Sequence, residues 1–179
     1  MITPDHFEAH ELLVCNTIEA HRGWHVERFD TKFFDDTTKR NLHNRKIESP
    51  LRHLPDLIAT HDSGRHVLIE CKSVEERNLD SPNYTIEVAS LDACIRWAHM
   101  STPVLIVWHD LSATRPSAVL TLRSTRLGAP STFGSGDDYY LVNRKDLRQV
   151  SNRLPYYLHR LVAGRFNDLD QPSLFEVKL

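Results

Sequence analysis

The chain has 179 residues, enough for one domain with a sizeable core, which we expect to span residues 1–179. Its 40% hydrophobic and 26% charged residues are ordinary for a globular protein, and its formal net charge of −2 excludes a chain that is basic throughout. No run approaches the roughly 18 apolar residues of a membrane span, and the first residues lack the basic and apolar segments of a signal peptide. We therefore expect a cytoplasmic protein with no membrane partner. Its cysteines (Cys15, Cys71 and Cys94) are far apart and predict buried free thiols.

Residues 3–21 have the pattern of a helix that begins after an N-cap and ends near Gly23. Val14 and Ile18 belong to its apolar stripe, and Glu11 falls on the same stripe. A carboxylate that faces the core is unfavourable unless a metal or a cation accompanies it. Glu11 is therefore a candidate site residue, and the alternative is a partly exposed helix glutamate.

Two histidine pairs have the i, i+4 spacing that can hold a metal on one helix face. They are His6 with His10 and His21 with His25. The second pair straddles the predicted helix end, and neither pair has an evident third ligand. An ordinary surface or core histidine is the favoured interpretation.

A predicted first strand, residues 24–29, is followed by a long segment, residues 30–53, with no sustained period. A connection of this length inside a compact domain is usually functional or disordered. Its second half is basic, and it leads directly into the next strand. We expect its basic side chains to contact nucleic acid; they are Lys39, Arg40, Arg45, Lys46 and Arg52.

Residues 56–61 and 66–72 are two β-favouring runs that predict a hairpin. The residues between them suit a three-residue loop with Gly64 in the left-handed conformation. Such a loop pairs His61 with Arg65, and this pairing determines all the remaining residue pairs along the two strands. Both faces of the hairpin are mostly apolar, which is typical of strands in the middle of a covered sheet.

Three charged side chains interrupt this apolar hairpin at its open end. The register places Asp56 opposite Glu70, with β-carbons about 4.5–5.5 Å apart. Lys72 lies on the same face, because side chains alternate along a strand. Two carboxylates and an ammonium group are therefore expected to meet inside the protein; the alternative is a surface ion pair.

Pro55-Asp56, followed by Glu70-Cys71-Lys72 after an apolar approach, resembles the motif of the PD-(D/E)xK nuclease superfamily. The resemblance implies a Mg²⁺ site, with Mn²⁺ able to substitute, formed by Asp56, Glu70 and the main-chain carbonyl of Cys71. Lys72 would orient or deprotonate the attacking water, for which its pKa would have to be lowered, or stabilise charge on the phosphate. In the superfamily an early helix often supplies an acidic residue, and Glu11 matches that position.

The order of the next elements agrees with this resemblance. The pattern predicts a loop at 74–84, a short strand at 85–88, a helix at 91–100 with Ser90 as its N-cap, and a central strand at 104–108. With the earlier elements this gives an α/β fold with the restriction-endonuclease-like αβββαβ core over about residues 3–110. We expect a mixed central sheet flanked by helices.

The remaining residues, about 111–179, predict a C-terminal extension of strands and helices. The expected elements are strands at 117–123 and 139–142, a loop at 127–138, helices at 144–153 and 155–163, and a tail from 166. Residues 144–165 form a second basic segment. Either basic segment can also be an ordinary solvated face.

The sequence thus predicts a metal-dependent DNA endonuclease that hydrolyses phosphodiester bonds in branched or duplex DNA. Holliday-junction resolvases are similar in format, and a homodimer would supply two active sites. RecB-like exonucleases often carry Gln-x-x-x-Tyr on the helix after the lysine, a pattern this chain lacks; Arg96 on that helix is a candidate phosphate contact. The alternative is a catalytically inactive nuclease-like protein that binds DNA or serves assembly.

Overall fold

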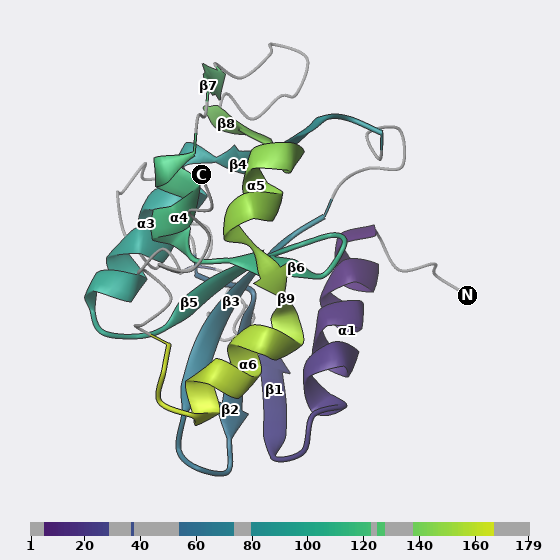
Figure 1. The fold of residues 1–179 in the computed structure, drawn as a ribbon, viewed down its shortest axis with the longest axis vertical. Coiled ribbons are helices and arrows are strands. Elements are labelled where there is room, and N and C mark those ends of the chain that lie inside the picture. The colour runs from purple at the N-terminus through teal and green to yellow at the C-terminus, as the bar shows by residue number, and fades with distance from the viewer. Residues whose placement is uncertain are drawn as a thin grey trace, which may run out of the picture.

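A mixed sheet forms the centre of the molecule (Figure 1). The computed structural model describes residues 6–28, 37, 54–73, 80–122, 125–127 and 138–166, and within these residues the sheet has six strands in the order β1-β2-β3-β5-β6-β9. Among the described strands of this sheet, only β3 and β5 are parallel; the other neighbouring pairs are antiparallel. The strands are β1 (Trp24–Arg28), β2 (Leu57–His61), β3 (His66–Lys72), β5 (Val104–Trp108), β6 (Ser112–Thr114) and β9 (Asn152–Arg153).

A second, smaller sheet lies beside the end of the first (Figure 1). In the described residues it has the order β4-β8-β7 and is antiparallel. Its strands are β4 (Asn83–Glu87), β8 (Tyr139–Asn143) and β7 (Thr125–Leu127). The helices are α1 (His6–Glu19), α3 (Val88–His99), α4 (Pro116–Thr121), α5 (Arg144–Val150) and α6 (Leu154–Val162). No described helix is long and apolar enough to cross a membrane.

Helices cover both faces of the central sheet (Figure 1). On one face, Ile69 and its neighbours pack against Val14 of α1 and Leu158 of α6. On the other face, Leu68 packs against Cys94 of α3. Farther along that second face, Trp108 belongs to a cluster with side chains from α3, α4, α5 and the small sheet. The central strands are therefore apolar on both sides, as the sequence predicts.

The hairpin has the predicted loop and register. The backbone N–H of His61 donates to the carbonyl of Arg65 at 2.7 Å, and Gly64 has a φ of +81°. Leu57 pairs with Ile69, so the next position outward sets Asp56 opposite Glu70, although Asp56 itself precedes the first residue of β2. By this register Asp56, Glu70 and Lys72 lie on the same face of the hairpin as Leu68, which is the face that α3 covers.

The elements α1, β1, β2, β3, α3 and β5 follow one another in the predicted αβββαβ order. The fold is thus a mixed α/β fold of the restriction-endonuclease-like kind, and the segment β4 is an addition between β3 and α3. Strand β5 has the predicted bounds, and all of its side chains are buried. The turn before β1 is tight, because a β-carbon on Gly23 would lie 2.8 Å from Nε2 of His61.

Three predictions about the later elements were wrong. The strand expected at 117–123 is the helix α4, which has Pro116 in its first turn and buries Val119. The helix expected at 144–153 ends at Val150, where the chain turns into β9. Helix α3 begins at Val88 rather than after Ser90, and Glu87 is its N-cap. Two of these differences coincide with contacts between distant segments: Val119 of α4 packs in the cluster of Trp108, and β9 pairs with β6.

The cysteines are free thiols, as predicted. Cys94 is buried, whereas Cys15 and Cys71 are only partly buried. Burial raises the pKa of all three thiols above the ordinary value, so they remain protonated at neutral pH. This thiol state is that of structural cysteines rather than of reactive nucleophiles.

Candidate functional site

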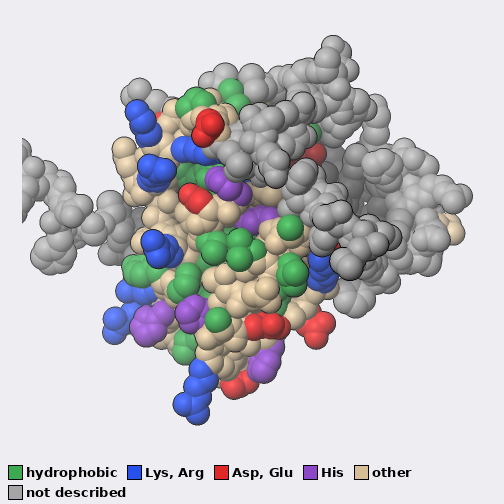
Figure 2. Space-filling model, turned by 90° about the vertical axis from the view of Figure 1, so that its right-hand side faces the viewer, with side chains coloured by type: hydrophobic (Ala, Val, Ile, Leu, Met, Phe, Trp, Pro, Cys, Tyr) green, Lys and Arg blue, Asp and Glu red, His purple; other side chains and the backbone are tan. Residues whose placement is uncertain are grey.

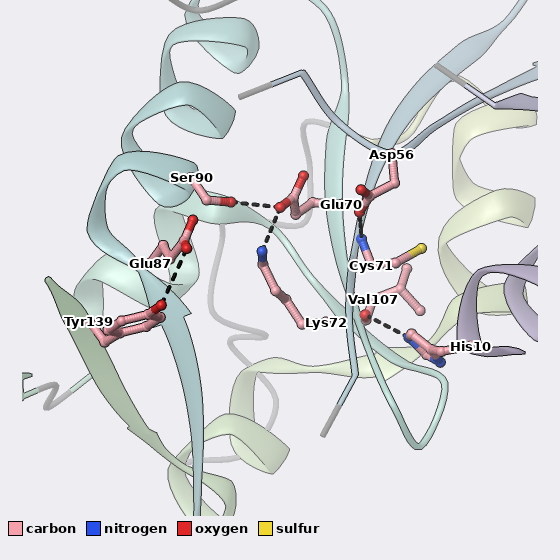
Figure 3. Close-up of polar contacts among 9 residues, drawn as sticks. All are labelled: His10, Asp56, Glu70, Cys71, Lys72, Glu87, Ser90, Val107 and Tyr139. Carbon is pink, nitrogen blue, oxygen red and sulfur yellow. Dashed lines mark hydrogen bonds and ion pairs between the residues drawn. The ribbon is translucent and has the colours of Figure 1, made fainter. Parts of the chain in front are cut away.

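The end of β3 brings together the charged residues that the hairpin register predicts (Figure 3). Oδ2 of Asp56 accepts a 2.6 Å hydrogen bond from the backbone N–H of Cys71. Oε1 of Glu70 forms a 2.6 Å ion pair with Nζ of Lys72 and also accepts a hydrogen bond from the hydroxyl of Ser90. Only 9% of the Glu70 side chain and 20% of the Lys72 side chain are exposed. The group is therefore a largely buried cluster and not a surface ion pair.

The Asp56 carboxyl is electrostatically strained in this cluster. Burial, together with the negative charge of Glu70, raises its pKa from 3.8 to about 8. The Lys72 ammonium and the Cys71 hydrogen bond act in the opposite direction but do not compensate. A second cation beside the two carboxylates would relieve this repulsion.

The pKa of Lys72 does not shift in the direction that a general base requires. Burial alone would lower its pKa, but the charge of Glu70 and their hydrogen bond outweigh burial, and the net shift is upward. This upward shift is opposite to the lowered pKa that a general base would need, and it favours the ammonium form. Lys72 is consequently suited to donate hydrogen bonds and to balance negative charge.

Glu11 lies within electrostatic reach of the site but has a cation of its own. Its Oε2 forms a 3.3 Å ion pair with Nη2 of Arg28 on β1, and 22% of its side chain is exposed. Its negative charge contributes to the raised pKa of Asp56 and of Cys71. Both interpretations of this residue thus retain a basis: its side chain is partly exposed, and its charge acts on Asp56 of the cluster.

The described residues contain no group of three or more His, Cys, Asp or Glu side chains arranged to hold a metal ion. The predicted donor set is smaller, since it takes two carboxylates and one main-chain carbonyl, that of Cys71. Mg²⁺ is usually held by one or two protein carboxylates and keeps several waters. The strained pair of Asp56 and Glu70 fits such an ion, because the ion's charge would offset the repulsion that raises the pKa of Asp56.

The histidine pairs do not form metal sites in the described residues. His10 is buried, and its Nε2 lies 3.3 Å from the carbonyl oxygen of Val107. Burial lowers the pKa of His10. His25 interacts instead with Asp62 at the hairpin loop, at 3.1 Å. The side chain of His6 lies outside the described residues.

Two residues near the cluster were not predicted as part of it. Ser90 was expected to cap a helix, but it lies inside α3 and its hydroxyl points to Glu70 (Figure 3). Glu87 precedes α3, accepts a 3.3 Å hydrogen bond from the hydroxyl of Tyr139, and contributes to the raised pKa of Lys72. Their position near the start of the predicted helix is a sequence signal that could have pointed to them, since helix N-termini often bind anions such as phosphate.

The predicted nucleic-acid contacts are mostly not placed by the structure. Lys39, Arg40, Arg45, Lys46 and Arg52 lie outside the described residues. Arg96 is exposed on α3, the helix that also carries Ser90.

No protein-family model and no curated protein matches this chain. Among solved structures, the chain is similar to Hjc, a Holliday junction resolvase from Archaeoglobus fulgidus. The two share 11% sequence identity, and the alignment covers 90% of this chain and 95% of that chain with a TM-score of 0.43. At this level of similarity, any functional assignment depends on the chemistry of the site.

Proposed function

We propose that the protein is a metal-dependent DNA endonuclease of the PD-(D/E)xK type that hydrolyses phosphodiester bonds. The observation that carries this proposal is the buried cluster of Asp56, Glu70 and Lys72 at the end of β3. A protein that only binds DNA gains nothing from two buried carboxylates that repel each other. A hydrolase does, because the same pair can hold a cation where the phosphate is attacked.

The proposed roles follow from the contacts of each residue. Asp56, Glu70 and the main-chain carbonyl of Cys71 would hold Mg²⁺ or Mn²⁺. The hydrogen bonds from the Cys71 N–H and the Ser90 hydroxyl orient the two carboxylates for this role. When bound, the ion neutralises charge on the phosphate and lowers the pKa of a coordinated water. The Lys72 ammonium binds a phosphate oxygen and balances the charge that develops there.

Glu11 has a secondary role in this proposal. Its carboxylate, on α1, adds negative charge to the environment of Asp56. We assign it to holding a metal-bound water or a second ion, with Arg28 setting its position through their 3.3 Å ion pair.

We propose branched or duplex DNA as the substrate. The support is the two basic segments of the chain, because arginine and lysine side chains neutralise backbone phosphates.

We also propose a homodimer, since cutting two strands needs two active sites and two-fold symmetry supplies them. Light scattering at micromolar concentration, with and without DNA, tests the dimer.

A cleavage assay with duplex, single-stranded and branched DNA in Mg²⁺ tests the activity. The parent protein should cut at least one substrate, and Asp56→Asn should abolish cutting. The matched control is Asp62→Asn, which alters an exposed carboxylate at the hairpin loop and should leave cutting unchanged. A parent that binds DNA but cuts none of the three substrates in Mg²⁺ or Mn²⁺ is a non-catalytic nuclease-like protein instead.

A further inference from the structure

A second polar site lies past the end of β5, outside the carboxylate cluster. A cavity of about 160 Å³ opens there between β4, the residues that follow β5, and α5. Arg144 and Arg148 of α5 line it; they are four residues apart and so share one face of the helix. His109 and Asp110 line it from the segment after β5.

Tyr84 of β4 fixes the shape of this cavity. Its ring stacks on Trp108, with ring centroids 4.9 Å apart and planes at 20°. The guanidinium of Arg144 lies over the ring, 4.3 Å from its centroid. The Tyr84 hydroxyl is 3.0 Å from Nδ1 of His109. The stacking preorganises the Arg144 guanidinium beside the cavity and leaves the tyrosine ring covered, so this site is unsuited to stacking a base.

The cavity has a net charge of about one positive unit. Arg144 and Arg148 carry two positive charges. Burial raises the pKa of Asp110, but hydrogen bonds from the backbone and hydroxyl of Ser112 outweigh burial and lower it, so the carboxylate is ionised. Burial lowers the pKa of His109, which is neutral at pH 7.

We propose that this cavity binds one phosphodiester group of the nucleic-acid backbone, beside the scissile position. A phosphodiester carries a single negative charge and matches the cavity, whereas a terminal phosphate monoester carries about 1.5–2. Arginine is the residue best suited to phosphate oxygens, because its planar group donates in a fixed fork. This inference rests on the proposed function to the extent that both require a nucleic-acid ligand.

The position of the cavity suits a nucleic-acid strand that also contacts Lys72. Trp108 is the register partner of Lys72 across the parallel pair of β3 and β5, and it carries Tyr84 on its ring. The cavity therefore lies at the same edge of the sheet as the carboxylate cluster, one strand farther along. We therefore place one backbone phosphate at Lys72 and another phosphate of the same nucleic-acid strand at Arg148.

Binding in EDTA tests this proposal without cleavage. Fluorescence anisotropy is measured with a labelled oligonucleotide over a range of salt concentrations, for the parent, Arg148→Gln and the control Arg65→Gln. Arg65 is exposed at the hairpin loop, at the opposite end of β3. Arg148→Gln should weaken binding roughly three- to tenfold at low salt and reduce the salt slope by about 1, whereas Arg65→Gln should change neither.

A series of oligonucleotides, each with one uncharged methylphosphonate, locates the phosphate. At one position in the series the parent should bind no better than Arg148→Gln, because the charge that Arg148 contacts is gone. A second pair of oligonucleotides, with and without a 5′-terminal phosphate, distinguishes the source of the anion. Parental affinity in Arg148→Gln, the absence of any such position, or an effect confined to the terminal phosphate would each overturn the proposal.

The proposed nuclease activity is tested separately from the cavity. If the parent passes the Arg148 and methylphosphonate binding tests and yet cuts no DNA, the phosphate site stands and the nuclease assignment fails. If the parent cuts DNA but Arg148→Gln binds as tightly as the parent, the nuclease assignment stands and the phosphate site fails. Thermal denaturation should give the same melting temperature for both arginine variants, which excludes unfolding as the cause of weaker binding.

Discussion

The hydroxyl of Ser90 on α3 donates a 2.6 Å hydrogen bond to Oε1 of Glu70 on β3, the same oxygen that binds Lys72. The Glu70 carboxylate is thus held from its own strand and from the helix that covers the sheet (Figure 3). This contact joins the start of α3 to the candidate metal ligand, so the position of the helix and the geometry of the site depend on each other.

Ser90→Ala should therefore affect both stability and metal binding. We expect the free energy of unfolding to fall by about 1–3 kcal/mol, because the lost hydrogen bond is buried and has a charged acceptor. The Mg²⁺ concentration for half-maximal cleavage should also rise, since Glu70 is less well oriented. Ser117→Ala, at an exposed position of α4, is the control and should alter neither quantity. A purely structural Ser90 would lower stability and leave the Mg²⁺ dependence unchanged.

The raised pKa of Asp56 predicts a specific pH dependence of stability in the absence of metal. Between pH 3.8 and about 8 the folded state binds more protons at this carboxyl than the unfolded state, so stability should fall as pH rises. Asp56→Asn removes this contribution and keeps an acceptor for the Cys71 N–H. The variant should match the parent near pH 4 and exceed it at pH 8 by an amount on the order of a few kcal/mol.

Urea denaturation in EDTA across this pH range measures the effect. Adding Mg²⁺ or Mn²⁺ at pH 8 should raise the melting temperature of the parent by mass action and leave that of Asp56→Asn unchanged. If Asp56→Asn destabilises the protein at pH 8, and the parent's melting temperature ignores both metals, the cluster is a structural ion-pair group.

Two variants at Lys72 should separate its effect on stability from its effect on DNA cleavage. Lys72→Met keeps an apolar side chain of similar length but leaves the Glu70 carboxylate buried without its cation, a loss of about 3–5 kcal/mol for a buried pair. The double variant Glu70→Gln with Lys72→Met should recover most of that loss, because no unpaired charge remains. Both variants should lack cleavage. Parental cleavage by Lys72→Met would remove this residue from the mechanism.

The basic segment after β1 should bind phosphates without reading sequence. Replacing Lys39, Arg40, Arg45 and Lys46 together with alanine should weaken binding to all DNA sequences alike and flatten its salt dependence. Anisotropy titrations with two unrelated duplexes at several salt concentrations measure both effects. Unchanged affinity at low salt excludes this segment from the interface.

The sequence by itself determined the hairpin and the contents of the cluster. The loop that ends at Gly64 and the alternation along the two strands are local properties, and together they fix which residues face each other. Asp56, Glu70 and Lys72 could be placed on one face for that reason. The buried strand β5 was also predicted with its observed bounds, because a short, wholly apolar run in a covered sheet has few alternatives.

Only the tertiary structure decided the contacts between distant segments. Ser90 reaches Glu70, and Arg144 reaches Tyr84, across separations that no local pattern encodes. The direction of the Lys72 pKa shift had the same origin: burial and the Glu70 charge act in opposite directions, and their balance depends on a 2.6 Å contact. Periodicity reports which face of an element is apolar, whereas electrostatic balance and hydrogen bonding depend on the distances that folding sets between elements.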